Sequence, residues 1–277
     1  MHISGIKVTL ADTLTSLYNM QMQKLLSAFL TSILLFFVAF GTVSANHSWG
    51  GYHWARTQNP FTLNLGDNMN SSWDPYLVTA SSDWNASSVL DTQIVTGGGR
   101  KNCRPTSGRV EVCNGKYGNN GWLGLAQIWV SGVHITQGTA KMNDTYFNTP
   151  SHNIPAWKRM VVCQEVAHDF GLDHQDENFN NSNLGTCMDY TSDPDGPPSN
   201  EHPNQHDFDM LETIYAHLDS FTTLSQSLGQ TARQAANLVS DDPGQWGRVV
   251  KDNGKVAVFE RDFGFGVKVF TFVIWAE

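Results

Sequence analysis

Residues 164–174 read Gln-Glu-Val-Ala-His-Asp-Phe-Gly-Leu-Asp-His, with the ligand-type side chains at a spacing that suits a helix followed by a turn. Residues four apart lie one above the other on a helix, so Gln164 and His168 project from one face, with Glu165 beside them. The glycine that follows suits a left-handed helix end, and the turned chain can bring His174 back toward that face. The spacing therefore predicts three donor side chains and one carboxylate converging at the end of a helix.

This stretch resembles the long zinc signature of the metzincin metallopeptidases, His-Glu-x-x-His-x-x-Gly-x-x-His, at every specified position except the first, which is Gln164 here. The resemblance implies that His168 and His174 bind zinc. It also implies that Glu165 is the general base that takes a proton from metal-bound water. Glutamine offers a neutral amide oxygen where zinc favours imidazole. The site could bind zinc more weakly, be completed by another residue, or have lost its metal.

A second segment, 185–190, reads Gly-Thr-Cys-Met-Asp-Tyr. In metzincins a turn that carries a methionine follows the third ligand and forms an apolar floor under the metal, and Met188 matches that residue. Tyr190 resembles the tyrosine that some metzincin families use as an extra, movable metal ligand or as an oxyanion stabiliser. Alternatively, both side chains simply fill the core.

Hydrophobic patterning predicts the strands and helices of an α/β (α+β) fold, and the resemblance to metzincins implies that the strands form a twisted mixed sheet. Alternation or β-type composition indicates strands, and apolar residues at helical spacing indicate helices. The expected strands are 60–65, 89–95, 121–130 and 134–143, and the expected helices are 73–90, 156–170 and 206–218. Strand, helix, strand is how a metzincin catalytic domain begins, although many other α/β proteins begin in the same way.

The resemblance also implies a substrate-binding strand. In metzincins the strand ahead of the zinc helix is the antiparallel edge of the sheet, and residues 123–130 resemble it. An exposed edge can pair with extended peptide backbone, which assigns Gly124, Ala126 and Ile128 to substrate binding. An ordinary edge strand without a ligand is the alternative. His134 and His152 could replace the missing histidine, but a lone histidine on a strand or loop is more often a hydrogen-bonded surface or core residue.

Four cysteines in an exported chain are more often paired than reactive. Cys103 and Cys113 bracket a loop with proline and glycine, and they could close a short disulfide. If the methionine turn packs under the helix as in metzincins, a disulfide between Cys163 and Cys187 would join this turn to the helix. Four cysteines allow three pairings, and a small buried apolar residue is the alternative role for each.

The N-terminus predicts export. Residues 25–40 form an almost unbroken apolar run that follows Lys24, and residues 41–45 are small and end in Val-Ser-Ala. This pattern is typical of a secretory signal cleaved after Ala45, and the run is shorter than the roughly 20 residues of a transmembrane helix. We therefore expect a secreted, extracellular or periplasmic protein with no stable membrane anchor after cleavage.

The rest of the chain divides into a metzincin-like domain over 46–218, a linker over 219–245 and a small β unit over 246–277. Three alternating segments, at 246–250, 255–261 and 267–275, predict a β-meander in that last unit. The net charge of −9 and the lack of a basic run argue against nucleic acid as a partner. Carboxylates over 193–200 could bind calcium, but they lack a fixed ligand spacing.

These features predict a zinc-dependent metalloendopeptidase that acts on a peptide or protein substrate. The rival hypothesis is a non-catalytic protein that binds peptides or proteins through a metzincin-like cleft, and Gln164 is the feature that favours it.

Overall fold

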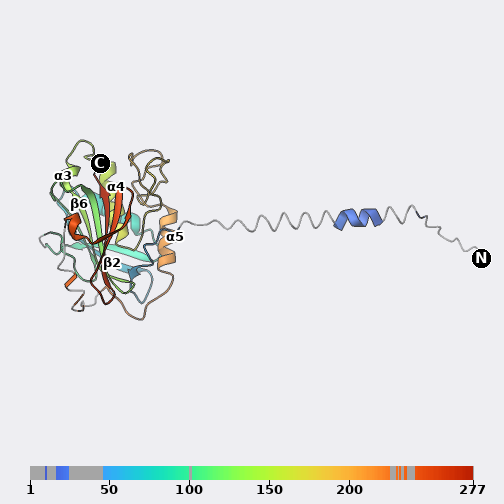
Figure 1. Ribbon diagram of the computed structural model, residues 1–277, viewed down its shortest axis with the longest axis horizontal. Helices are drawn as coiled ribbons and strands as arrows, with labels where there is room; N and C mark the ends of the chain where they lie inside the picture. The colour runs from blue at the N-terminus through green and yellow to red at the C-terminus, as the bar shows by residue number, and fades with distance from the viewer. Residues whose placement is uncertain are drawn as a thin grey trace, which may run out of the picture. The chain divides into compact units, whose positions relative to one another are not determined.

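A mixed β-sheet organises the chain from Asn46 onward in the computed structural model (Figure 1). The structure describes residues 10, 17–24, 46–99, 102–224, 229, 231, 234–235 and 241–276. The chain divides into two compact units, Met1–Ala45 and Asn46–Glu277. In the first unit, residues 17–24 are helical, whereas the predicted signal over 25–45 lies outside the described residues. No helix in the described part of the chain is long and apolar enough to cross a membrane.

The sheet of the second unit has the strand order β3-β2-β4-β6-β5-β9-β8-β7, and a short strand β1 also pairs with β6. Strands β1, β2, β3, β4 and β6 are joined by parallel pairings, whereas β5, β9, β8 and β7 continue the sheet in antiparallel fashion. The bounds are β1 His53–Trp54, β2 Phe61–Asn68, β3 Leu90–Thr96, β4 Val110–Gly115, β5 Trp122–Ser131, β6 His134–Asn143, β7 Arg248–Asp252, β8 Val256–Asp262 and β9 Val267–Trp275.

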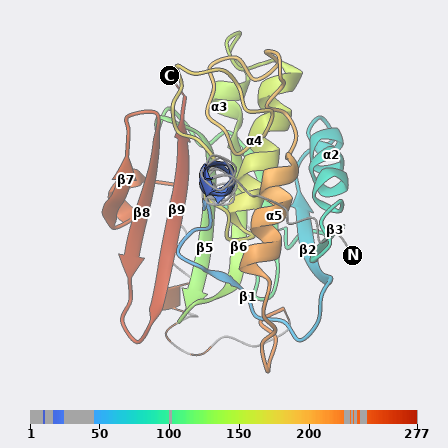
Figure 2. The ribbon, with the colours of Figure 1, turned by 90° about the vertical axis from the view of Figure 1, so that its right-hand side faces the viewer.

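Helices cover the parallel half of this sheet. Figure 2 shows α4 and α5 in front of β6, and α2 beside β2 and β3. The bounds are α2 Asp74–Trp84, α3 Asp144–Phe147, α4 Pro155–His168, α5 Gln205–Ile214 and a short 3₁₀ turn, η1, at Pro243–Gln245. Asn204 and Asp207 form a capping box at the start of α5, which satisfies backbone donors that the first turn leaves free.

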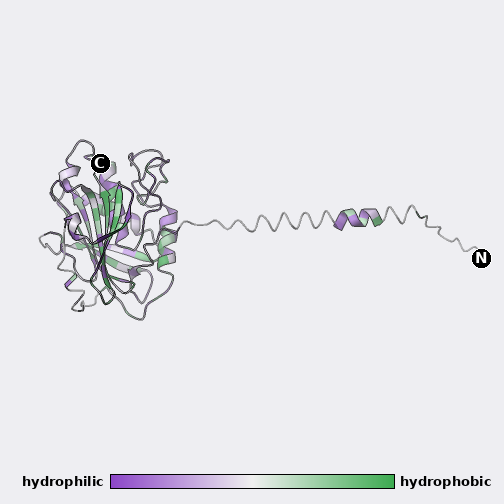
Figure 3. Cartoon of the chain, in the orientation of Figure 1, coloured by the Kyte–Doolittle hydropathy of each residue, from purple (hydrophilic) through white to green (hydrophobic). Residues whose placement is uncertain are grey.

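The main core lies between the helices and the sheet. It contains apolar residues of α2, α4 and α5, and those of β9 that face the helices are Phe270, Phe272 and Ile274. Alternate residues of β9 lie on the opposite face, where Val273 packs in a smaller cluster with Trp122 and Trp246. This two-sided burial explains why hydrophobic residues are concentrated along the central strands (Figure 3).

The prediction of a mixed α/β fold is confirmed, and most predicted elements are present with shifted ends. The expected helix over 73–90 ends at Trp84, because Asn85 caps it and a turn leads into β3. Strands β1 and β4 were not predicted. β1 has only two residues, and β4 lies within the segment that was interpreted as a loop between cysteines.

The C-terminal meander differs most from expectation. Its three strands form as predicted, but β9 pairs with β5 along Trp122–Ser131. β5 is therefore an interior strand, and the prediction that residues 123–130 form the sheet edge is wrong. The described residues of the expected linker also pack on the domain: Thr223 donates its backbone N–H to Ala55, and Trp129 donates to the Ala235 carbonyl. Residues 46–277 thus form one compact unit.

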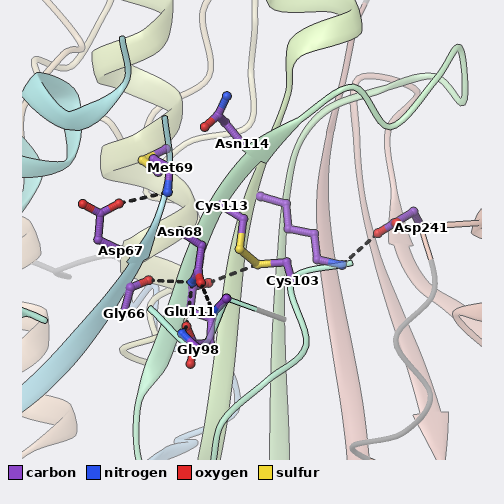
Figure 4. The surroundings of a disulfide bond; sticks show 12 residues. Gly66, Asp67, Asn68, Met69, Gly98, Cys103, Glu111, Cys113, Asn114 and Asp241 are labelled. Atoms are coloured by element: carbon purple, nitrogen blue, oxygen red, sulfur yellow. Dashed lines mark hydrogen bonds and ion pairs between the residues drawn. A yellow bond between two sulfur atoms is a disulfide. The ribbon is translucent and has the colours of Figure 1, made fainter. Parts of the chain in front are cut away.

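Both predicted disulfides are confirmed, Cys103–Cys113 and Cys163–Cys187. The first joins β4 to the loop before it (Figure 4). The Glu111 carboxylate lies beside this bond and accepts hydrogen bonds from Asn68 Nδ2 at 2.6 Å and from the Gly98 backbone at 3.0 Å. A buried carboxylate thus connects the disulfide loop to the end of β2.

Candidate active site

Helix α4 carries the first part of the candidate site. Pro155 occupies the first turn, where its missing N–H would have no helical partner. Gln164 and His168 are one turn apart on this helix, and both they and Glu165 are buried. The predicted start of the helix is confirmed, and its last helical residue is His168.

Gly171 turns the chain after the helix. Its φ is +94°, and an added Cβ would lie 2.1 Å from the Tyr52 carbonyl oxygen, so a side chain fits neither the backbone conformation nor the space. The turn returns the chain to His174, whose ring lies 4.5 Å from that of His168 in an edge-to-face arrangement. The two histidines of the sequence motif therefore meet in space.

Met188 and Tyr190 come from the segment after His174. The Met188 carbonyl accepts a hydrogen bond from the Gln175 backbone at 2.6 Å, and the preceding cysteine is tied to α4 by the Cys163–Cys187 disulfide. The Tyr190 hydroxyl lies 2.9 Å from Nδ1 of His174 and closer still to Nε2. Tyr190 therefore belongs to the same buried group of side chains.

The titratable side chains of the motif on α4, Glu165 and His168, are fully buried. Burial, reinforced by the nearby Asp169 carboxylate, raises the pKa of Glu165 well above its ordinary value. Burial and the neighbouring His174 lower the pKa of His168 well below its ordinary value. Both shifts favour the neutral form, which leaves the imidazole of His168 free to act as a metal ligand.

A hydrogen bond determines which ring nitrogen of His168 carries the proton. Nδ1 lies 2.9 Å from the Leu172 carbonyl oxygen, which can only accept, so Nδ1 carries the proton and Nε2 keeps its lone pair. Metal-bound histidines in proteins are oriented by this kind of contact. His168 is therefore prepared to bind a metal through Nε2.

Three polar atoms in the site have no hydrogen-bond partner: Oε1 and Nε2 of Gln164, and Oε2 of Glu165. A buried polar atom without a partner costs about 1–3 kcal/mol. The oxygen atoms of these side chains and the imidazole nitrogens make up a donor set that suits zinc. These side chains are of types that zinc accepts, and an ion bound there would give the buried amide oxygen a partner.

Gly124 on β5 lies directly against the general-base candidate. A Cβ added at Gly124 would lie 2.4 Å from Oε1 of Glu165 and 2.5 Å from Cγ1 of Val161. Only glycine leaves room for the carboxylate at this point of the strand. The residue that was predicted to bind substrate backbone thus also makes space for Glu165.

The C-terminal strand covers the site. In the β5–β9 register Gly124 is paired with Ile274, Ala126 with Phe272 and Ile128 with Phe270. The ring of Phe272 stacks on His168. The backbone of the predicted substrate-binding residues is therefore already paired with the chain itself.

Charged residues that the motif did not indicate surround His174. Its Nδ1 lies 3.2 Å from Asp173 Oδ1 and 3.5 Å from Glu177 Oε1. Lys251 of β7 pairs with both carboxylates, at 3.0 Å from Asp173 Oδ2 and in a shorter contact with Glu177. This lysine and Phe272 of β9 are the contacts between the meander and the site that sequence reasoning missed. They are far away in sequence, and no spacing rule links them to the motif.

The two spare histidines lie elsewhere. His134 is at the start of β6, where it contacts Asp219 and His53 rather than α4. His152 packs edge-to-face against Trp157 and, with Ser151, lines an open pocket of about 420 Å³ that reaches Phe179 and Ile274. Neither histidine contacts Gln164 or His168 in any interaction that the described residues show.

No protein-family model and no curated protein matches the chain. Among solved structures, it is similar to high choriolytic enzyme 1, a hatching enzyme zinc-protease from Oryzias latipes, the medaka fish. That similarity has a TM-score of 0.34 and 10% sequence identity, and covers 59% of this chain and 94% of that chain. A likeness this low is no basis for assigning a function, which has to be derived from the chain's own residues.

Proposed function

We propose that this chain is a zinc-dependent metalloendopeptidase in which Gln164, His168 and His174 hold the metal and Glu165 is the general base. One observation carries the proposal. A buried glutamate with an unpartnered carboxylate oxygen lies on the same helix turn as a histidine oriented through its Nδ1, and a second histidine meets the first. A protein that had lost its catalytic activity would have no structural need for this carboxylate in a buried site.

The protein residues divide the chemistry of peptide hydrolysis between them. When bound, zinc supplies a Lewis acid that polarises the scissile carbonyl. Glu165 removes a proton from the attacking water, whose oxygen forms a bond to the carbonyl carbon. The same carboxyl group then donates that proton to the leaving nitrogen as the C–N bond breaks. Glu165 must be in its carboxylate form to accept the first proton, and the positive charge of a bound metal would favour that form against the burial that raises its pKa.

Tyr190 is placed to assist. Its hydroxyl contacts His174 inside the site, and burial raises its pKa well above the ordinary value, which keeps it a hydrogen-bond donor. A donor held in a desolvated site stabilises negative charge that develops on a carbonyl oxygen. Removal of this hydroxyl should therefore lower turnover more than substrate binding.

Substrate access requires movement of the C-terminal meander. An extended peptide binds to a sheet edge through free backbone N–H and C=O groups, and β9 occupies those groups of β5. The proposed peptidase is therefore latent in the described conformation. A peptide can pair with Gly124, Ala126 and Ile128 only after β9 has left β5.

Export completes the proposal. The apolar run over 25–40 and the small residues that follow it predict a signal peptide. Two disulfides fit an oxidising compartment, such as the extracellular space or the periplasm.

A second candidate function is a non-catalytic binding protein. Two observations favour it: glutamine replaces the first histidine of the signature, and β9 covers the site. Such a protein would bind a peptide or protein partner without cleaving it.

The decisive test is cleavage of a denatured protein substrate and a mixed peptide library by zinc-loaded protein, read by mass spectrometry. Native protein and Glu165→Gln are compared, because glutamine keeps the size of the side chain but cannot carry the proton. We expect slow cleavage by the native protein, from molecules in which β9 has left β5, and a loss of at least ~100-fold in Glu165→Gln. Binding of peptides without cleavage would favour the second candidate. Equal cleavage by both proteins would show that a contaminant is responsible.

A further inference from the structure

Outside the candidate active site, four side chains place atoms that can bind a metal ion close to one another. They are His53, His134, His217 and Asp219. Nε2 of His53 lies 3.1 Å from Nε2 of His217, and Nε2 of His134 lies 3.2 Å from Oδ1 of Asp219. The remaining recorded contacts are 3.6 Å from His53 Nε2 to Asp219 Oδ2 and 3.9 Å from His217 Nε2 to Asp219 Oδ1. The ligand atoms of His53, His134 and Asp219 all lie within 4.8 Å of one another.

These four residues come from three distant parts of the chain. His53 is on β1 and His134 begins β6, and the two are directly paired in the parallel β1–β6 ladder. His217 and Asp219 follow α5, and Asp219 is anchored by a backbone hydrogen bond to the Arg56 carbonyl at 2.9 Å. The fold therefore brings three imidazoles and a carboxylate together at one end of β1 and β6.

The shortest contacts in this cluster are close to the ligand spacing of a tetrahedral zinc site. Zinc bonds of about 2.0–2.1 Å place neighbouring tetrahedral ligand atoms roughly 3.3 Å apart. The contacts of 3.1 Å and 3.2 Å are close to this value, and the 3.9 Å contact of His217 with Asp219 Oδ1 is longer. Three imidazole nitrogens and one carboxylate oxygen are also ligands that zinc accepts. We propose that His53, His134, His217 and Asp219 form a second zinc site.

Two contacts outside this set orient the ligands. Nδ1 of His53 lies 2.8 Å from the Gly51 carbonyl oxygen, so Nδ1 carries the proton and Nε2 directs its lone pair at the other ligands. Arg56 pairs with Oδ2 of Asp219 at 3.0 Å, which leaves Oδ1 for the metal. Without a metal, two ring nitrogens at 3.1 Å need a proton between them, and His217 would have to supply it.

Burial indicates a structural role for this site. The side chain of His53 is 5% exposed and that of Asp219 10%, whereas that of His217 is 54% exposed. Zinc can therefore enter from the solvent side, and four protein ligands leave no open position for a substrate. The ion would tie the segment after α5 to β1 and β6. This inference does not depend on the proposed peptidase site, because the two sites share no residue.

The test is a zinc titration of the purified full chain in a His168→Ala background, which removes a ligand of the candidate active site. His217→Ala is the test variant, because an exposed side chain can be removed without opening the core. His202→Ala is the matched control: this histidine is 50% exposed and pairs with an aspartate, Asp83, at 2.7 Å. Affinity is measured by competition with a chelator, and cobalt(II) replaces zinc for absorption spectroscopy.

We expect the His168→Ala chain and its His202→Ala derivative to bind about one zinc ion and to show the visible bands of four-coordinate cobalt. His217→Ala should weaken zinc binding more than ~100-fold, which exceeds the loss caused by removing an orienting contact. Equal zinc affinity in His217→Ala and His202→Ala would overturn the proposal. So would a His168→Ala chain that binds no zinc, since the cluster would then be a hydrogen-bonded group only.

Discussion

The phenyl ring of Phe272 stacks on the imidazole of His168, with ring centroids 4.4 Å apart and an interplanar angle of 8°. Phe272 belongs to the C-terminal strand β9, and His168 belongs to α4, the helix that carries Gln164 and Glu165. This contact joins the last strand of the fold to the residue that we assign to the metal. It makes the position of β9 a determinant of whether the site can act on a substrate.

Replacement of Phe272 by alanine should open the site. The variant should cleave peptides faster than the native protein, because β9 loses the contact of Phe272 with His168. It should also lose about 3–5 kcal/mol of unfolding free energy through the cavity that it leaves. Cleavage rate and urea unfolding are measured on the same preparation.

Phe259→Ala is the control for this experiment. Phe259 is on β8 of the same meander but packs with Trp246 on the other side of the sheet. It should lose stability without gaining activity. Equal gains in the two variants would mean that general loosening, rather than exposure of His168, increases the rate.

Gly124→Ala should inactivate the protein. The new Cβ would come within 2.4 Å of Glu165 Oε1 and 2.5 Å of Val161, and such overpacking costs about 1–3 kcal/mol. We expect a loss of cleavage of at least ~10-fold, because the general base is displaced from its position. Gly115→Ala, whose added Cβ would meet only Tyr117 at 3.5 Å, should change neither quantity. If Gly124→Ala cleaves normally, Glu165 is not held against β5 during catalysis.

Protonation of Glu111 at acidic pH should decrease the free energy of unfolding. Burial raises the pKa of this carboxyl group, but hydrogen bonds from Gly98, Asn68 and Arg109 help to outweigh burial and leave the pKa below its ordinary value. A carboxyl group with a lowered folded-state pKa stabilises the protein above its unfolded-state pKa of about 4.3, and this contribution is lost as pH falls through the lower, folded-state value.

Unfolding free energy measured from about pH 6 downward should therefore fall less steeply in Glu111→Gln than in the native protein. Glu212→Gln, at an exposed carboxyl on α5, should follow the native curve. Parallel curves for Glu111→Gln and the native protein would show that Glu111 binds protons equally in both states.

Removal of the Cys163–Cys187 disulfide should destabilise the protein and disturb the site. This bond closes a loop of sequence separation 24. The chain-entropy account predicts a loss of about 3 kcal/mol for the Cys163→Ala/Cys187→Ala pair, and slightly less for Cys103→Ala/Cys113→Ala, whose loop is shorter. Zinc affinity should decrease only in the first pair, because that bond ties α4 to the Met188 segment. Equal zinc affinity in both pairs would contradict this role.

Local patterns were sufficient to predict much of this structure. Helical spacing indicated the positions of Gln164 and His168, and the glycine at 171 correctly indicated the turn that returns His174. Alternating composition indicated most strands and the C-terminal meander. These features depend on residues close together in sequence, so their periodicity carries the information.

The features that were missed depend on contacts between distant segments. The alternating composition of 267–275 indicates a strand, but it does not show that its partner is β5, which lies far earlier in the chain. The same holds for the His53, His134, His217 and Asp219 cluster, whose members share no motif spacing. His134 was considered as a substitute ligand for the helix site, whereas its partners lie on β1 and after α5.

Zinc content tests the central claim most directly. The purified full chain, Gln164→His and His168→Ala are dialysed against buffer with trace zinc, and bound metal is measured by elemental analysis. The account predicts that His168→Ala retains about one zinc equivalent fewer than the native protein and that Gln164→His binds zinc at least as tightly as the native protein. Equal zinc content in the native protein and His168→Ala would contradict it, because the helix site would then hold no metal.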